Sequence, residues 1–154
     1  NGCIWYWMMM QNNITTCREF KTECRNYFFY ISKINRILET KRGIEYRMEG
    51  VHSIDFQKLP GTKGASNYDC RLGLMDIKKQ LDEQSQEYLN RLEYILDVFN
   101  AFPVRAYRVI GWKAYIQGDT VTSIAEKLGV SPDILLKELK NQVNAALQII
   151  NRTK

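Results

Sequence analysis

The sequence has few of the residues that interrupt helices. Its 154 residues include only 3 prolines and 9 glycines, and sparse breakers over long stretches favour helices over the frequent turns of an all-β chain. It also has a single histidine, His52, which leaves no Ser/His/Asp or Cys/His set for nucleophilic catalysis. We therefore expect an all-α protein that is not an enzyme.

Cysteines are few and widely spaced. The four are Cys3, Cys17, Cys24 and Cys70, and they include no closely spaced CxxC pair of the kind that binds zinc. Cys17 and Cys24 are seven residues apart, which places them on one face of a helix. We expect free, reduced, half-buried thiols and neither a metal nor another cofactor.

The sequence has no hydrophobic run long enough to span a bilayer. The most apolar segment, residues 1–10, is too short to do so and lacks the basic start and cleavage site of a signal peptide. A natural start at one of Met8, Met9 or Met10 is one explanation of this segment, and we leave it out of the fold prediction. With no targeting segment, we expect a cytoplasmic protein with no membrane partner.

Two long segments have the spacing of amphipathic helices. In residues 15–50 apolar side chains recur every three or four positions, with an interruption or kink expected at Lys41-Arg42-Gly43. In residues 69–99 the spacing is close to a heptad, with Lys78 and Ser85 at two positions of the seam.

Residues 52–68 separate these segments and contain Pro60-Gly61 without any periodicity, which predicts a flexible loop. Two amphipathic stripes joined by a loop predict an antiparallel, coiled-coil-like helical hairpin over residues 11–100. Its seam either closes on itself or also pairs with a second copy in a homodimer.

Residues 101–154 are predicted to form a separate domain of three helices. The first starts at Pro103, a residue suited to the first position of a helix, and ends before Gly118. The second is capped by Asp119 or Thr120 and runs to residue 128. The last starts at Pro132, after Ser131 as N-cap, and runs to about residue 151.

The segment 120–135 has the pattern of a helix-turn-helix. Ala125 is small where the next helix crosses, and Gly129 permits the positive φ of a three-residue turn. The predicted core wedge between the two helices consists of Ile124, Leu128, Val130 and Leu135.

Three short motifs resemble region 4 of bacterial sigma factors and, more closely, a family of phage and prophage late-transcription regulators. They are Tyr107-Arg108, the sequence Tyr-Ile-Gln-Gly at residues 115–118, and Ile-Ala-Glu-Lys-Leu-Gly-Val-Ser at residues 124–131. The resemblance covers about the last fifty residues and departs from the family at Lys113-Ala114, where leucine-arginine is usual. It implies a sigma-like transcription regulator in a bacterial host cell that contacts promoter DNA, RNA polymerase or both.

The charge distribution agrees with a polyanionic partner for the last third of the chain. The net charge is +5. From residue 101 onward the sequence contains eight basic and four acidic residues, whereas residues 51–100 contain six basic and eight acidic residues. The expected contacts with double-stranded DNA are Arg108, Lys127, Ser131, Lys137, Lys140 and Asn141. Gln142 is a further side chain of a type that reads bases.

Three functions are compatible with these residues. In the first, the helix-turn-helix binds promoter DNA. In the second, the same fold docks on RNA polymerase or another regulator through the apolar side chains Ile134 and Leu136, which cannot hydrogen-bond to bases. In the third, the chain is a small terminase-like subunit of a DNA-packaging enzyme. Tyr107, Trp112 and Tyr115 lie at helical spacing and are expected in the core of the C-terminal domain.

Overall fold

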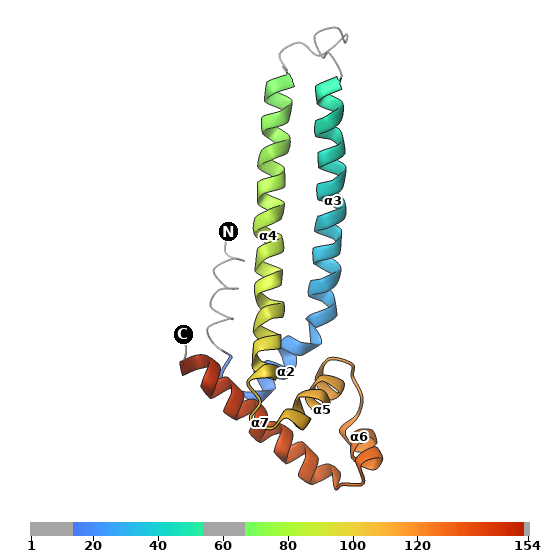
Figure 1. Cartoon of the computed structure of the whole chain (residues 1–154), viewed down its shortest axis with the longest axis vertical. Helices are drawn as coiled ribbons and strands as arrows, with labels where there is room; N and C mark the ends of the chain where they lie inside the picture. The colour runs from blue at the N-terminus through green and yellow to red at the C-terminus, as the bar shows by residue number, and fades with distance from the viewer. Residues whose placement is uncertain (1–13, 54–66, 153–154) are drawn as a thin grey trace. The chain divides into compact units, whose positions relative to one another are not determined.

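The computed structural model describes residues 14–53 and 67–152, and these residues form helices and no strand (Figure 1). The predicted all-α class is confirmed. Side chains are described for residues 14–49 and 70–152. Residues 1–13 and most of the predicted loop lie outside the described set. None of the described helices has the length and apolarity needed to cross a bilayer.

The structure describes six helices. They are α2 (Cys17–Arg25), α3 (Tyr27–Ser53), α4 (Asn67–Asn100), α5 (Arg105–Tyr115), α6 (Val121–Leu128) and α7 (Pro132–Arg152). The chain divides into two compact units, one made of Phe29–Asn90 and the other of Asn1–Phe28 together with Arg91–Lys154. This division differs from the predicted boundary at residues 100 and 101, because α2 and the end of α4 pack with the C-terminal helices.

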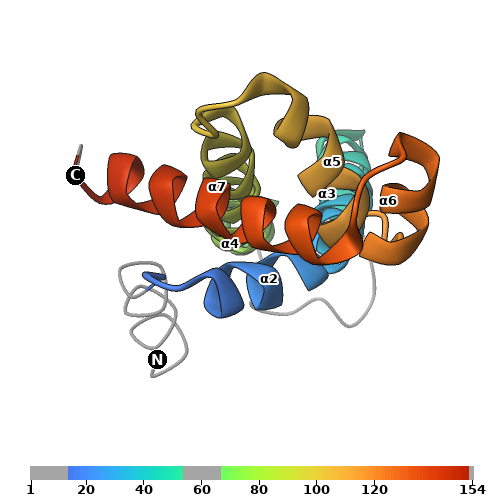
Figure 2. The same cartoon turned by 90° about the horizontal axis from the view of Figure 1, so that it is seen from below.

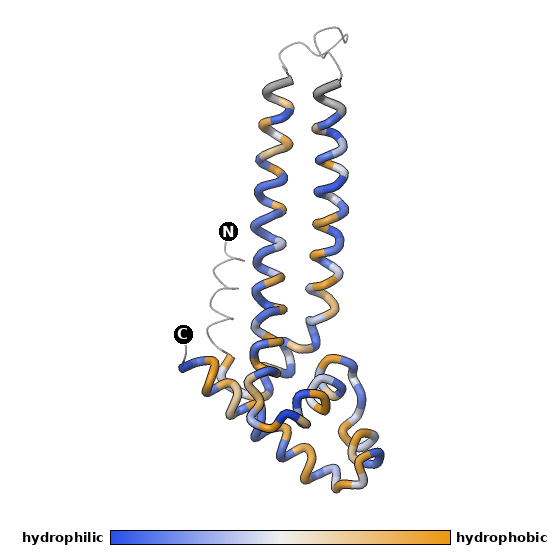
Figure 3. Tube along the Cα trace, in the orientation of Figure 1, coloured by the Kyte–Doolittle hydropathy of each residue, from blue (hydrophilic) through white to orange (hydrophobic). Residues whose placement is uncertain are grey.

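The unit Phe29–Asn90 contains most of α3 and α4, which run antiparallel. Buried residues of α3 recur every seven positions at Tyr30, Ile37 and Ile44, as expected for a coiled-coil seam. Tyr30 meets Tyr88 of α4 with ring centroids 5.9 Å apart. Elsewhere hydrophilic residues predominate along both helices (Figure 3).

Ion pairs fix the register of these two helices. Lys41 pairs with Asp82, and Glu45 accepts from Lys78 at 3.1 Å. The pairs join residues four positions apart on each helix in opposite directions, which only one antiparallel register permits. Each exposed pair contributes at most about 1 kcal/mol, so their main effect is on alignment. Lys78, which the heptad pattern places in the seam, is one of the paired residues.

The break in the first helical segment was predicted at the wrong place. The helix continues through Gly43, which is exposed and has no neighbouring side chain against it. The interruption lies instead at Asn26, whose backbone N–H caps α2 by donating to the carbonyls of Cys24 and Glu23. A single glycine costs a helix only about 1 kcal/mol, whereas the break at Asn26 allows α2 to join the other compact unit.

An aromatic cluster forms the centre of that second unit. Its members are Phe20, Tyr27, Phe99, Phe102, Trp112 and Tyr115. Phe99 contacts Phe20 of α2 at 5.3 Å between ring centroids and Trp112 of α5 at 5.5 Å. Phe20 and Phe102 are almost completely buried. Edge-to-face contacts of this kind add about 0.5–1.5 kcal/mol per pair to the burial of the rings.

Gly111 allows α5 to approach this cluster. A Cβ atom at residue 111 would lie 3.0 Å from Cε2 of Phe102 and 3.2 Å from Cε1 of Phe99. Both atoms belong to packed rings, so a larger residue would push α5 away from the cluster. Helices α2, α5 and α6 lie along α7 (Figure 2), and the amide of Asn151 donates to the carbonyl of Ile14 at 3.4 Å.

A nearly buried ion pair also joins α2 to α4. Arg91 Nη1 lies 3.7 Å from Glu23 Oε1, and only about a tenth of either side chain is exposed. Tyr94 is close by, and burial followed by the negative charges of Glu23 and Glu19 raises its pKa to about 12. The tyrosine therefore stays neutral through the physiological pH range. The charges buried between α2 and α4 are those of Arg91 and Glu23.

We expect Arg91→Met to lower the free energy of unfolding by about 3 kcal/mol, because it leaves the Glu23 carboxylate buried without its cation. Urea denaturation measures the loss. The double variant Glu23→Leu/Arg91→Met is the control, and it should recover most of the stability since both charges are then gone. A double variant no more stable than Arg91→Met would contradict this account.

Candidate nucleic-acid interface

Helices α6 and α7 are joined by a tight turn with the predicted residues at its key positions. The Thr120 side chain accepts from the backbone N–H of Ser123 at 3.1 Å and caps α6. Gly129 ends α6 in the left-handed region, at φ 69° and ψ 30°. α7 then begins at Pro132, as predicted, and Leu135 N–H donates to the Ser131 carbonyl at 3.0 Å.

The core between these helices differs in composition from the predicted wedge. It consists of Ile124, Ala125, Leu135 and Leu139, with Tyr107, Ile110, Ala114 and Val121 packed against it. Ala125 is fully buried, as expected for a small residue at a helix contact. Leu128 and Val130, however, are 52% and 46% exposed, so their place in the predicted wedge is wrong. Leu139, one turn beyond Leu135, occupies this core instead.

Four of the predicted DNA contacts lie exposed on α7 or just before it. They are Ser131, Lys137, Lys140 and Asn141. The opposite side of α7 is buried through Leu135, Leu139, Gln142, Val143, Ala146 and Leu147. Since each residue turns the helix by about 100°, Lys137 and Asn141 fall on the side away from this buried stripe. Lys140 is exposed at the edge of the stripe, seven residues before the buried Leu147. Asp133 and Glu126 are exposed nearby and reduce the positive charge of the face.

Arg108 and Gln142 are directed into the protein. Arg108 is half-buried, and its Nη2 donates to the carbonyl of Phe102 at 3.3 Å. Gln142 Oε1 accepts from the backbone N–H of Val104 at 3.0 Å. Both residues therefore hold the connection between α4 and α5. This connection explains why α5 begins at Arg105 rather than at the predicted Pro103, because residues 102–104 are held in a non-helical conformation.

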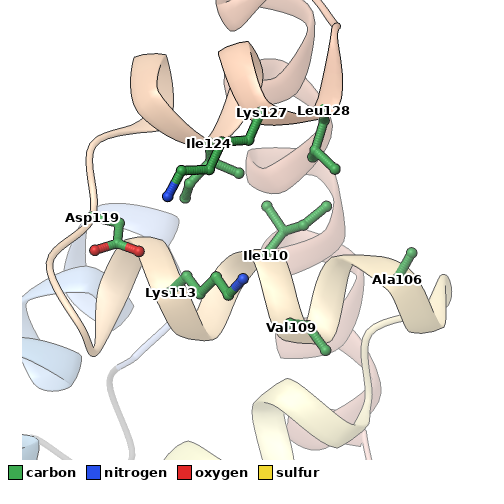
Figure 4. A pocket seen from close by; sticks show the side chains of 8 residues that line it. All are labelled: Ala106, Val109, Ile110, Lys113, Asp119, Ile124, Lys127 and Leu128. Carbon is green, nitrogen blue, oxygen red and sulfur yellow. The ribbon is translucent and has the colours of Figure 1, made fainter.

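Lys127 lies in a different environment from the lysines of α7. It lines a cavity of about 340 Å³ between α5 and α6 (Figure 4). The other lining residues are Ala106, Val109, Ile110, Lys113, Asp119, Ile124 and Leu128. Leu128 faces this cavity, which accounts for its exposure. The sequence pattern does not predict this cavity, since no periodic signal marks the space between two short helices.

The two apolar residues proposed for protein docking lie on different sides of α7. Ile134 is 62% exposed and Leu136 is 45% exposed. They are two positions apart, so their side chains are separated by about 200° around the helix axis. One flat partner surface cannot contact both from the same direction. The pair therefore does not form a single apolar patch.

The cysteines in the described part of the chain are free. Cys17 and Cys24 are buried in α2, and Cys70 is half-buried in α4. Burial, followed by the charge of Glu23, raises the pKa of the Cys24 thiol well above its usual range. Cys17 Sγ lies 3.9 Å from the hydroxyl of Tyr115, whose pKa is also raised by burial. Within the described part of the chain, no cluster of three His, Cys, Asp or Glu side chains can hold a metal ion.

Comparisons with protein-family models, curated proteins and solved structures found no significant match to this chain.

We expect Gly129→Ala to lower the free energy of unfolding by about 1 kcal/mol, because an alanine Cβ is strained at positive φ. Gly43→Ala is the matched control. It makes the same chemical change at an exposed position inside α3 and should raise stability by about 0.5–1 kcal/mol. Thermal denaturation followed by circular dichroism measures both. Equal effects of the two substitutions would be incompatible with the turn described at Gly129.

Proposed function

We propose that the chain is a transcription regulator that binds double-stranded DNA through α6 and α7, which act as a helix-turn-helix carried by a long helical hairpin formed by α3 and α4. The observation that carries this proposal is the set of exposed polar residues Ser131, Lys137, Lys140 and Asn141, which lie on α7 or just before it while the other side of the helix is buried in the core. In this proposal the protein is a phage or prophage regulator in the bacterial cytoplasm.

The dimensions of a helix and the chemistry of these residues support a duplex partner. An α-helix with its side chains is about 10–12 Å in diameter, and a major groove about 12 Å wide admits one such helix. Ammonium groups neutralise phosphates and release counterions, while a hydroxyl and an amide add hydrogen bonds. The divergence of Ile134 and Leu136 favours this partner over a flat protein surface.

We expect the double variant Lys137→Ala/Lys140→Ala to bind DNA more weakly than the wild type, because two phosphate contacts are removed. Fluorescence anisotropy of a labelled random duplex at several salt concentrations measures this. The slope of log affinity against log salt should become less steep by about 2, since each phosphate contact contributes about 0.9.

The matched control is Arg42→Ala/Lys79→Ala, which removes two exposed cations from the unit Phe29–Asn90. It has the same net charge as the test variant and should keep the wild-type slope. Equal losses in the two variants would show that net charge alone drives binding. Unchanged affinity and slope in Lys137→Ala/Lys140→Ala would remove α7 from the interface.

Docking on RNA polymerase is a second candidate, favoured by the high exposure of Ile134. If no duplex binds even at low salt, we expect immobilised wild-type protein to retain purified bacterial RNA polymerase. Ile134→Asp should abolish retention, because a carboxylate cannot enter an apolar pocket without a large desolvation cost. Circular dichroism of the variant verifies that it is folded. Undiminished retention by both Ile134→Asp and Leu136→Asp would eliminate this function.

A further inference from the structure

Ile134 is an unusual residue for the exposed side of a DNA-binding helix. It is among the most exposed large apolar side chains described, at 62%, and it lies in the first turn of α7. An isoleucine side chain forms no hydrogen bond with water and cannot pair with a phosphate. Apolar side chains do have one partner in the major groove, the C5-methyl group of thymine.

The position of Ile134 on α7 separates it from the core. Residues seven apart are aligned to within about 20° on a helix, so Ile134, Asn141 and Gln148 share one line along α7. All three are exposed. Leu136 shares its line with Val143, which is completely buried. Leu136 therefore continues the edge of the core, whereas Ile134 belongs to the outward face.

Lys137 completes this outward face. It is exposed and lies three residues from Ile134 and four from Asn141, which makes it a neighbour of both on the helix surface. A lysine at this place can pair with a phosphate or with guanine. Ile134, Lys137 and Asn141 thus place an apolar group, a cation and a carboxamide next to one another within about two helical turns.

We infer that Ile134 and Asn141 read bases, Ile134 through a thymine methyl group and Asn141 through adenine, whose N6 and N7 match a carboxamide. The inference rests on the proposed function, because it applies only if α7 enters the major groove. The two residues are about 10.5 Å apart along the helix, and base pairs are 3.4 Å apart. Because a helix in the groove is inclined to the duplex axis, the preferred site accordingly contains a T·A pair and an A·T pair at most about three base pairs apart.

The experiment starts with the full chain and a pool of random duplexes. Bound duplexes are recovered, sequenced and compared with the starting pool, and we expect enrichment of the T·A and A·T pairs at this spacing. The selected duplex is then made with uracil in place of the contacted thymine, which removes only the methyl group. Wild-type affinity should fall about fourfold, the effect of losing about one buried methyl group.

The same duplexes tested on variants assign the contact. Ile134→Ala should bind the thymine and uracil duplexes equally, because it has no side chain that reaches the methyl group. Leu136→Ala is the matched control on the other line of α7 and should keep the fourfold difference. Asn141→Ala should lose about tenfold at the adenine position and bind all four base pairs there equally.

The outcomes separate this inference from the proposed function. Salt-dependent binding without an enriched position, or a uracil effect that persists in Ile134→Ala, would overturn the base-reading assignment while leaving DNA binding intact. Absence of binding to any duplex at low salt would overturn both. Loss of the uracil effect in Ile134→Ala, and its retention in Leu136→Ala, would establish the assignment.

Discussion

The ring of Phe99 is the contact on which the C-terminal helices depend. It lies near the end of α4 and touches rings from α2, α5 and the connection between α4 and α5. Close approach is possible only because residue 111 is glycine, with no Cβ to displace the rings of Phe99 and Phe102. Since packed aromatic rings tolerate little change in volume, this cluster sets where α5 lies, and α5 in turn supports α6 and α7.

Helix α7 therefore carries the candidate interface and also contributes residues to the core. Gln142 is on the same helix as Lys137 and Lys140, yet it points inward and binds the backbone of Val104. Successive residues of α7 thus divide between holding the helix and facing outward. Asn141 and Gln142 are adjacent in the sequence, and the 100° turn between them sends one to solvent and the other to the connection before α5. A rigidly held helix suits a role in which side chains must meet fixed groups on a partner.

Sequence patterns predicted the parts of this structure that depend on local chemistry. The positive φ of Gly129 and the start of α7 follow from short motifs whose residues act on their own backbone, and Thr120 is one of the two caps, with Asp119, that the sequence left open for α6. Local motifs do not predict the helix break at Asn26 or the inward orientation of the Gln142 side chain. Asparagine is not a strong helix breaker, and a glutamine on a helix surface carries no mark of a backbone partner 38 residues away. Both are decided by tertiary contacts.

The unit that holds the candidate interface is assembled from the two ends of the chain, and this has a consequence for the order of folding. Cys17 of α2 meets Tyr115 of α5 across 98 residues of sequence. A ribosome adds about 5–20 residues per second, so α2 waits roughly 5 to 20 seconds for its partner during synthesis. Until residue 115 is added, Phe20 and Cys17 lack their contacts with Tyr115, whereas all residues of the unit Phe29–Asn90 are synthesised earlier. In newly made chains, α3 and α4 can therefore pair before α2 finds its place in the other compact unit.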